Sequence, residues 1–407
     1  MALIVQKYGG SSLSDSRRIT GVAKRIVASV QEGHRVVVVV SAMGDTTDEL
    51  IELAHQITGE PDPRELDVLL STGETVSSTL LAMALRRLGH EAISLSGAQA
   101  GIRTDSAYSH ARILSVEADR VLEELDQGKV VIVAGFQGTA PDMDITTLGR
   151  GGSDTTAVAL AATIKADQCE IYTDVPGVFT ADPRLVPDAV KLNDIGFEEM
   201  LELASYGTVV VHPRAVELGA AFNIPILVAS SFDDQPGTLI HGGEPLEVRN
   251  KISSIAHDTD VAKITLLGVP DRPGIAAAIF EPLADAGVSV DTIVQNASVD
   301  RVTDLTLTVS RSDLRKAEEL VRSIAESLGS RGYVSDSELA KVSIVGTGML
   351  NAPGYAARMF RALYDAGINI ELITTSDIRI TCIVARAKVK AAVQSLHDAF
   401  VLEKVEN

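Results

Sequence analysis

The chain has 407 residues and a net charge of −19 at pH 7, so nucleic acid and an anionic membrane surface are poor candidates as partners. It is 45% apolar but only 4% aromatic, which suits two or three domains packed with aliphatic side chains. Cys169 and Cys382 lack metal-site spacing and are expected to be reduced thiols. With no signal-peptide pattern and no apolar run of membrane-spanning length, we expect a soluble cytoplasmic protein.

The first segment predicts a strand, a Gly-rich turn and a helix. An apolar strand pattern at residues 3–7 leads into the turn KYGGSS, residues 7–12, and an amphipathic stretch follows at 17–30. Such a turn presents backbone N–H groups to phosphates. Because its lysine precedes the glycines, it is neither a Walker A loop nor a dinucleotide-binding fingerprint. Taken alone, the segment fits a plain tight turn better than a ligand site.

Residues 1–245 alternate between strand and helix patterns. The run 36–40 is apolar on both faces, as in a central parallel strand covered by helices. The alternation predicts a mostly parallel sheet in a three-layer α/β/α sandwich, with ligands beyond the carboxyl ends of the strands. The predicted strands are 3–7, 35–41, 92–96, 130–134, 169–173, 209–211 and 226–228. The predicted helices are 17–30, 46–57, 64–87, 118–126, 155–166, 197–205 and 213–222.

A second Gly-rich segment, TLGRGGSD at residues 147–154, carries the strongest functional signal. Its glycines let the backbone approach a ligand closely, and Arg150 offers planar donors to a carboxylate or phosphate. Ser153 or Asp154 can cap the helix that follows, whose free N–H groups favour an anion. An ordinary loop with a helix cap is the alternative. Together, the two Gly-rich segments suggest two anionic substrates brought close to each other.

An internal repeat follows residue 245. KITLLG at 263–268 matches KVSIVG at 341–346, and both copies continue with Pro-Gly, Phe and Asp-Ala-Gly at matching spacing. Each copy reads as an α+β unit with a strand, a Pro-Gly turn, a helix, two strands and a second helix. An extra strand-like piece, 252–256, precedes the first copy. A tandem duplication that binds no ligand is the alternative to a regulatory function.

The ordered motifs of the chain resemble those of aspartate kinases. Besides the two Gly-rich segments, these are VSAMG at 40–44, STGE at 71–74, YTD at 172–174, TADPR at 180–184 and HPR at 212–214. The resemblance covers essentially the whole chain. It implies an amino-acid kinase domain at 1–245 and ferredoxin-like ACT domains at 263–335 and 341–403, the second of which 252–256 could complete. The implied reaction is ATP-dependent phosphorylation of the L-aspartate β-carboxylate to 4-phospho-L-aspartate, the first step of lysine, threonine and methionine biosynthesis.

The resemblance also implies roles for individual residues. Lys7 would bind the transferring phosphoryl group, and Asp154 would orient Lys7 and the reacting groups. No general base is needed, because the carboxylate of the substrate is already ionised at neutral pH. Glu74 would pair with the substrate ammonium and Arg150 with its α-carboxylate. The aspartate site would include Ser41, Thr47, Glu74, Arg150, Gly151, Gly152 and Ser153. The ATP site would include Lys7, Tyr8, Gly9, Gly10, Ser11, Thr173, Asp174, Thr180, Asp182, Pro183 and Arg184. Mg²⁺ is implied as the ATP counterion, and its contacts stay open between Asp182 and a water shell.

Two ACT units behind a kinase imply feedback inhibition by lysine and/or threonine, with effectors bound between chains of a homo-oligomer. An ACT-only small subunit would be a further partner. The effector sites implied by the resemblance comprise Asp271, Gly274, Val288, Ser289, Val290, Gln295, Tyr355, Ala356, Asn369, Ile370, Ser376 and Asp377. The alternative is that these units serve only dimerisation. Two other functions stay open: a catalytically silent, amino-acid-binding subunit, and a sister kinase that acts on another small acid.

One position departs from the family pattern. The family commonly has Gly-Ala-Lys ahead of Val-Leu-His-Pro, with the lysine near the nucleotide, whereas this chain has Val209 at that place. Loss of the positive charge predicts weakened ATP binding, unless another basic residue takes over. Val209→Lys should therefore lower the KM for ATP in a steady-state assay. An ordinary ATP KM that this substitution leaves unimproved would contradict the prediction.

Overall fold

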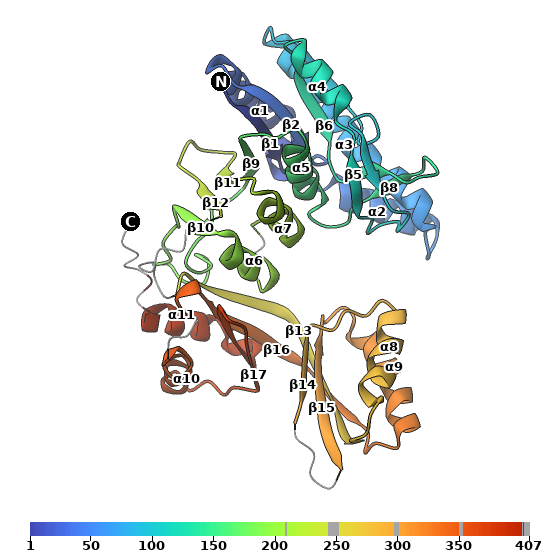
Figure 1. The fold of residues 1–407 in the computed structure, drawn as a ribbon, viewed down its shortest axis with the longest axis vertical. Coiled ribbons are helices and arrows are strands. Elements are labelled where there is room, and N and C mark those ends of the chain that lie inside the picture. Colours follow the sequence, from blue (N-terminus) through green and yellow to red (C-terminus); the bar gives the residue numbers. More distant parts are fainter. Residues whose placement is uncertain (208–209, 243–251, 297–300, 350–352, 401, 403–407) are drawn as a thin grey trace. The chain divides into compact units, whose positions relative to one another are not determined.

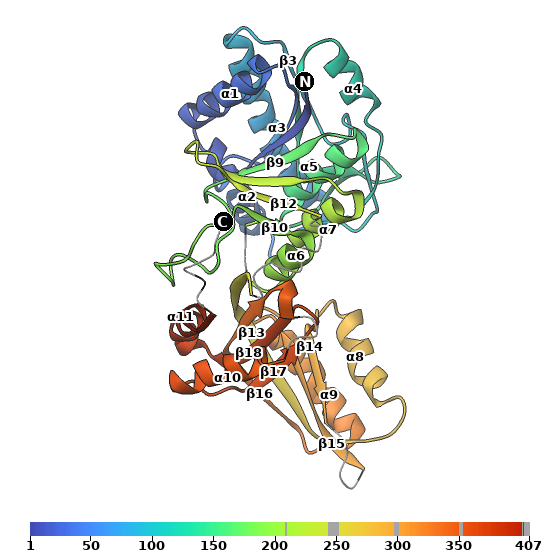
Figure 2. The ribbon, with the colours of Figure 1, turned by 60° about the vertical axis from the view of Figure 1, so that its left-hand side comes forward.

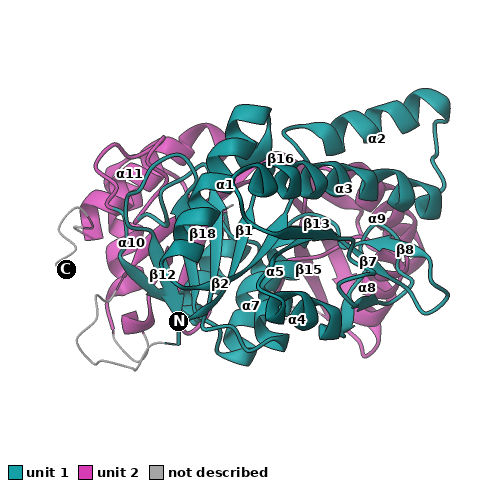
Figure 3. Ribbon diagram, turned by 90° about the horizontal axis from the view of Figure 1, so that it is seen from above, with its two compact units in different colours: residues 1–179, 191–246, 407 teal, residues 180–190, 247–406 magenta. Residues whose placement is uncertain are grey.

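The computed structural model describes residues 1–207, 210–242, 252–296, 301–349, 353–400 and 402. The chain divides into two compact units, coloured separately in Figure 3. Unit 1 consists mainly of Met1–Phe179 and Lys191–Leu246, and unit 2 consists of Thr180–Val190 and Glu247–Glu406. The predicted boundary at 245 lies outside the described residues. The segment Thr180–Val190 belongs to unit 2, although the sequence analysis placed it in the kinase domain.

The core of unit 1 is an eight-stranded, mostly parallel sheet (Figure 1). From one edge to the other, its strands are β10 (Asp194–Gly196), β12 (Thr238–His241), β11 (Ile226–Ser230), β9 (Gln168–Thr173), β1 (Leu3–Tyr8), β2 (Arg35–Val40), β6 (Val130–Ala134) and β3 (Ala92–Leu95). The only antiparallel pair among these described strands joins β11 to β12. A smaller sheet holds β5 (Ile113–Val116), β4 (Ile102–Thr104), β7 (Gln137–Thr139) and β8 (Ile145–Thr147).

Helices cover both faces of the large sheet, which gives the predicted three layers (Figure 2). On one face, α1 (Ser16–Gln31) and α3 (Pro63–Arg87) pack together over Val36, Val38 and Val40. On the other face, α5 (Gly152–Thr163) packs against β1, β2 and β9. The further helices are α2 (Thr46–Ile57), α4 (Asp119–Asp126), α6 (Phe197–Ser205) and α7 (Pro213–Phe222), and a 3₁₀ turn, η1 (Gly10–Leu13), follows β1. By length and composition α3 could cross a membrane, but half of its apolar window is buried in the fold, as expected for a core helix.

Two local predictions were wrong. Val210 and Val211 lie in a turn instead of the predicted strand at 209–211, and Val209 lies outside the described residues. Val211 is buried, and burial explains its apolar character without strand pairing. The helix α5 starts at Gly152, with Gly151 in the N-cap position, so Ser153 and Asp154 lie in its first turn instead of capping it. The N-cap position has a φ of +67°, a left-handed backbone conformation that favours glycine, and Gly151 occupies it.

Unit 2 contains one six-stranded antiparallel sheet shared by the two halves of the repeat. Its order is β14 (Thr292–Gln295), β15 (Val302–Val309), β13 (Ser254–Pro270), β16 (Tyr333–Val345), β18 (Arg379–Ala385) and β17 (Leu372–Thr375). The long strands β13 and β16 each serve both halves: Ser254–Asp258 pair with Lys341–Val345, while the rest of β13 pairs with β15 and the start of β16. The first half is thus inserted into the second. Helices α8 (Ile275–Asp285) and α9 (Leu314–Leu328) pack on the first half, and α10 (Tyr355–Asp365) and α11 (Val389–Phe400) pack on the second.

Two ion pairs cross between the halves in equivalent positions. Lys341, in the second half, pairs with Asp291 of the first. Its counterpart in the repeat, Lys263, pairs with Glu371 of the second half, with 3.2 Å between Nζ and Oε2, and this bond lowers the pKa of Glu371. The two halves are therefore joined by reciprocal electrostatic contacts as well as by shared strands.

Candidate active site

A cavity of about 460 Å³ lies at the carboxyl ends of β1 and β2, between α2, α3 and the first turn of α5. Every residue predicted for catalysis or aspartate binding lines it: Lys7, Ser41, Thr47, Glu74, Arg150, Gly151, Gly152, Ser153 and Asp154. Other lining residues were not predicted, notably Asp48, Ser109, His110 and Phe136. Asp48 and Ser109 belong to no Gly-rich motif, and only the fold brings them to this place.

An ion pair lies at the centre of the cavity wall. Nζ of Lys7, near the end of β1, is 2.6 Å from Oδ1 of Asp154, and each side chain is only 11% exposed. The other carboxylate oxygen of Asp154 accepts the main-chain N–H of His212 at 3.4 Å. Because the pair is shielded from water, its charges interact more strongly than surface charges would. The Lys7 ammonium is thereby held at the cavity surface in a fixed position.

Glu74 supplies a second charge at a different point of the cavity. Its side chain, on α3, is buried, and Oε1 accepts the main-chain N–H of Ala42 at 3.0 Å. Among the described residues, no hydrogen-bond partner reaches Oε2. Burial raises the pKa of Glu74 to about 7. A buried carboxylate oxygen without a partner is suited to a cationic ligand group, which would restore its charged form.

The Gly-rich loop forms a further part of the cavity wall. Gly151 has a left-handed backbone, and a Cβ there would lie 2.2 Å from Cγ of His212. His212 thus packs directly against the loop, and glycine is required at 151 on both counts. Arg150 is exposed at the cavity rim, where its guanidinium can reach a ligand carboxylate.

The first group of predicted ATP residues lies on two paired strand ends. Lys7 and Tyr8 of β1 are in register with Ile171 and Tyr172 of β9, and Gly9 donates to the Tyr172 carbonyl at 3.2 Å. Gly10 lines the cavity, and Ser11 lies next to it in η1. Thr173 is the last residue of β9, and its hydroxyl donates to Oδ1 of Asp174, the next residue, at 3.1 Å.

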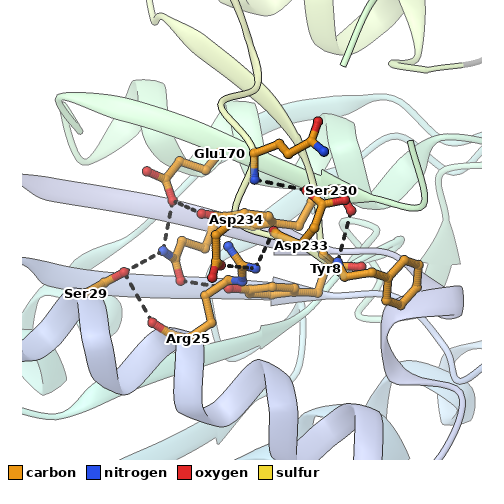
Figure 4. Close-up of polar contacts among 12 residues, drawn as sticks. Tyr8, Arg25, Ser29, Glu170, Ser230, Asp233 and Asp234 are labelled. Carbon is orange, nitrogen blue, oxygen red and sulfur yellow. Dashed lines mark hydrogen bonds and ion pairs between the residues drawn. The ribbon is translucent and has the colours of Figure 1, made fainter. Parts of the chain in front are cut away.

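The Tyr8 side chain cannot contact a nucleotide directly. It is fully buried and stacks on Tyr172 with 4.9 Å between ring centroids. Its hydroxyl donates to Gln6, and Gln6 donates to Glu170 and Ser29 in a network that joins β1, β9 and α1 (Figure 4). Burial raises the pKa of the Tyr8 hydroxyl, which keeps it a donor. The Tyr8 carbonyl accepts the Ser41 N–H at 3.1 Å, so this residue supports the strand ends from within the sheet.

The second group of predicted ATP residues, Thr180, Asp182, Pro183 and Arg184, belongs to unit 2. Thr180 is buried, with its hydroxyl 3.0 Å from Nε2 of His397, and its carbonyl accepts the Ile255 N–H at 2.7 Å. Asp182 pairs with Arg184 at 2.7 Å, and this bond lowers the pKa of Asp182. The segment is therefore built into the second half of the repeat.

Comparisons with known proteins identify the family. Residues 2–230 match the amino acid kinase family, and residues 263–326 and 342–400 each match the ACT domain. The aspartokinase of Corynebacterium glutamicum is 51% identical over 407 residues, which cover 99% of this chain and 97% of that protein. The chain belongs to the aspartokinase family. The enzyme therefore phosphorylates L-aspartate with ATP.

Solved structures of an aspartokinase have the same fold. Aspartokinase III of Escherichia coli in complex with aspartate and ADP (R-state) is 26% identical to this chain, with a TM-score of 0.83. The match covers 98% of this chain and 99% of that chain. The same aspartokinase in complex with lysine and aspartate (T-state) gives a TM-score of 0.75 at the same identity and coverage. The ferredoxin-like order of both halves of unit 2 agrees with the ACT matches.

In the present chain, the residues predicted for effector binding form two groups at opposite edges of the unit 2 sheet. Asp271, Gly274, Val288, Ser289, Val290 and Gln295 surround β14 and the start of α8. Tyr355, Ala356, Asn369, Ile370, Ser376 and Asp377 surround β17 and the start of α10. Because β14 and β17 are the two edge strands, the groups do not face each other within one chain.

Proposed function

We propose that the cavity binds L-aspartate with its ammonium against Glu74 and its α-carboxylate at Arg150, so that the β-carboxylate points to Lys7. The observation that carries this assignment is the buried, unpartnered Oε2 of Glu74 in the same cavity as the Lys7–Asp154 pair. Hydroxyls of Ser41, Thr47 and Ser153, with main-chain N–H groups of Gly151 and Gly152, supply the remaining polar contacts.

The chemical step requires positioning and charge neutralisation. The β-carboxylate oxygen attacks the γ-phosphorus of ATP, and the bond to the β,γ-bridging oxygen breaks, so that ADP leaves. Lys7 neutralises the charge on the transferring group, and Asp154 holds the Lys7 ammonium in place. The N-terminus of α5, with Ser153 and Asp154 in its first turn, adds a partial positive charge.

ATP would bind along the ends of β1 and β9, over residues 7–11 and 173–174. Among the described residues, no three His, Cys, Asp or Glu side chains converge as a metal site would require. We therefore assign Mg²⁺ no protein ligand set and propose that it arrives with the nucleotide as its counterion and keeps most of its water ligands. Asp182 is not suited to hold it, because Arg184 donates hydrogen bonds to both of its carboxylate oxygens.

We further propose feedback inhibition by lysine and/or threonine through the ACT domains, placed at 263–335 and 341–403 behind a kinase domain at 1–245. An aspartokinase has been solved in complex with lysine. The edge strands β14 and β17 expose Ile293 and Ile373 at equivalent positions, which suits side-by-side pairing with a second chain or an ACT-only subunit. We place this homo-oligomer in the cytoplasm.

Replacing the lysine of the ion pair tests the catalytic assignment. Lys7→Ala should lower kcat about 100-fold or more with a smaller change in the aspartate KM, because its charge acts on the transition state. The measurement is hydroxamate formation from aspartate, ATP and Mg²⁺, with glutamate and acetylglutamate as alternative substrates. Lys24→Ala, at an exposed lysine of α1, is the matched control. A Lys7→Ala enzyme with half the wild-type activity would rule the role out.

The raised pKa of Glu74 predicts how aspartate recognition depends on pH. Protonation of Glu74 as the pH falls through about 7 removes the charge that faces the substrate ammonium. The ammonium stays charged throughout this range, so kcat/KM for aspartate should fall by about tenfold per pH unit below that point. In Glu74→Gln, kcat/KM for aspartate should be low and flat with pH, while the ATP KM changes little. A larger effect on the ATP KM would move Glu74 to the nucleotide side.

Regulation is tested by rates at increasing lysine, threonine and both together, with calorimetry on the intact enzyme. Asp271→Ala or Asp377→Ala should raise the effector concentration needed for inhibition by about tenfold or more, because the lost carboxylate would meet the effector ammonium. Asp285→Ala, at an exposed aspartate of α8, should leave inhibition unchanged. If neither amino acid binds or alters the rate, the ACT units serve only assembly.

A further inference from the structure

Asp67 is a completely buried carboxylate on α3 that binds two residues of the cavity wall. Its Oδ2 accepts the main-chain N–H of Thr147 at 2.8 Å, and its Oδ1 accepts the Thr147 hydroxyl at 2.7 Å. The main-chain N–H of Ser109 lies 3.0 Å from both oxygens, and the Ser109 hydroxyl is 3.4 Å from Oδ1. One carboxylate thus joins α3 to two segments that are distant from each other in the sequence.

Both segments carry groups that line the aspartate cavity. Thr147 ends β8 and begins the Gly-rich loop with Arg150, and Ser109 immediately precedes His110. Ser109 has a φ of +67°, a left-handed conformation that a serine holds only where neighbouring contacts enforce it. Gly149, at φ +74°, packs so closely that a Cβ would lie 3.1 Å from the Ser109 carbonyl oxygen. The two segments therefore have one close-fitting arrangement.

Arg214, from the HPR motif, binds the same two segments through acceptors instead of donors. Its Nη1 donates to the carbonyl of Leu148 at 2.8 Å, and its Nη2 donates to the carbonyl of Ala111 at 3.1 Å. Leu148 follows Thr147, and Ala111 lies two residues after Ser109. The negative group on α3 and the positive group on α7 thus bind each segment at points only one or two residues apart.

We propose that Asp67 and Arg214 are positioning residues that set the aspartate pocket by fixing the Gly-rich loop against the segment 109–111. The inference rests on the proposed aspartate site and extends it to two residues that touch no substrate. A carboxylate is needed at 67 because its donors are two N–H groups and two hydroxyls, while an Asn amide would turn an N–H₂ group toward one of them. A planar, two-armed guanidinium is needed at 214 because two separate carbonyls must be reached together.

An ion pair in the same region, which is separate from Asp67 and Arg214, provides a matched control. Arg64 of α3 pairs with Asp144 at 2.7 Å, and the hydroxyl of Tyr108 donates to Asp144 at 3.0 Å. This pair also joins α3 to the approach to β8 and to the neighbourhood of Ser109. It is partly exposed, and neither of its residues lines the cavity. If substitutions acted only through a general loss of rigidity, those at Arg64 and Asp144 would impair the enzyme as much as those at Asp67 and Arg214. A positioning role predicts an effect at Asp67 and Arg214 alone.

The test is steady-state kinetics of Asp67→Asn and Arg214→Lys, beside Asp144→Asn and Arg64→Lys, with thermal unfolding of each. Loss of bonds to a charged group should raise the aspartate KM about tenfold or more in both test variants. The ATP KM should stay within about twofold, because residues 7–11 and 173–174 make no bond to either group. The control variants should keep the wild-type KM for aspartate and the wild-type KM for ATP, even where their unfolding temperature falls as much as that of the test variants.

Each other outcome has a definite meaning. An unchanged aspartate KM in the folded test variants, or equal changes in the aspartate and ATP KM, overturns the inference. If Asp67→Asn does not fold, Arg214→Lys decides, because it keeps the charge and the α7 helix. An inactive wild-type enzyme, or a Glu74→Gln variant with an unaltered aspartate KM, would instead remove the proposed aspartate site itself.

Discussion

The parallel pairing of β1 with β2 on one side and β9 on the other is the constraint on which the active site depends. Because these neighbouring strands end at the same edge, Lys7, Ser41 and Thr173 lie close together although they are far apart in the sequence. The Lys7–Asp154 pair then joins that edge to the first turn of α5. The charge to which we assign catalysis is consequently held by Asp154 in the folded chain, so that little side-chain freedom would be lost when a phosphoryl group binds.

Local charge, not net charge, explains how so acidic a protein can bind two anions. Lys7, Arg150 and the N-terminus of α5 provide positive potential within one cavity. With aspartate bound as we propose, Glu74 in the same cavity would disfavour a simple dicarboxylic acid, which brings no ammonium to meet it. In the site that we propose, this mixture of signs would select for an amino acid over its deaminated analogue, because Glu74 is removed from water.

The fold of unit 1 could be predicted from the sequence because its strands are continuous apolar runs separated by amphipathic helices. Val36–Val40 is an example: this strand is buried on both faces, so none of its positions is polar. The predicted strand at 209–211 was wrong because Val211 is apolar through burial outside any strand, and the sequence alone does not separate the two cases. The residues of the Gly-rich motifs were found because their backbone requirements are local. Asp67 was not found: an aspartate inside a helix has no local signature, and its partners become neighbours only in the folded chain. For the same reason, no pattern showed that Thr180–Val190 packs with unit 2.

The two long strands of unit 2 have a consequence for how this region forms. Ser254–Asp258 complete the second half of the repeat, but their partners, Lys341–Val345, are synthesised only after the whole first half. The first half can assemble early from its own strands, whereas the emerging chain must keep the start of β13 unpaired until much later. Since β13 and β16 run through both halves, neither half can lose its strands without breaking the ladder of the other, and the crossed Lys263 and Lys341 pairs add to this coupling. The repeat, although double in sequence, should open and close as a single cooperative unit.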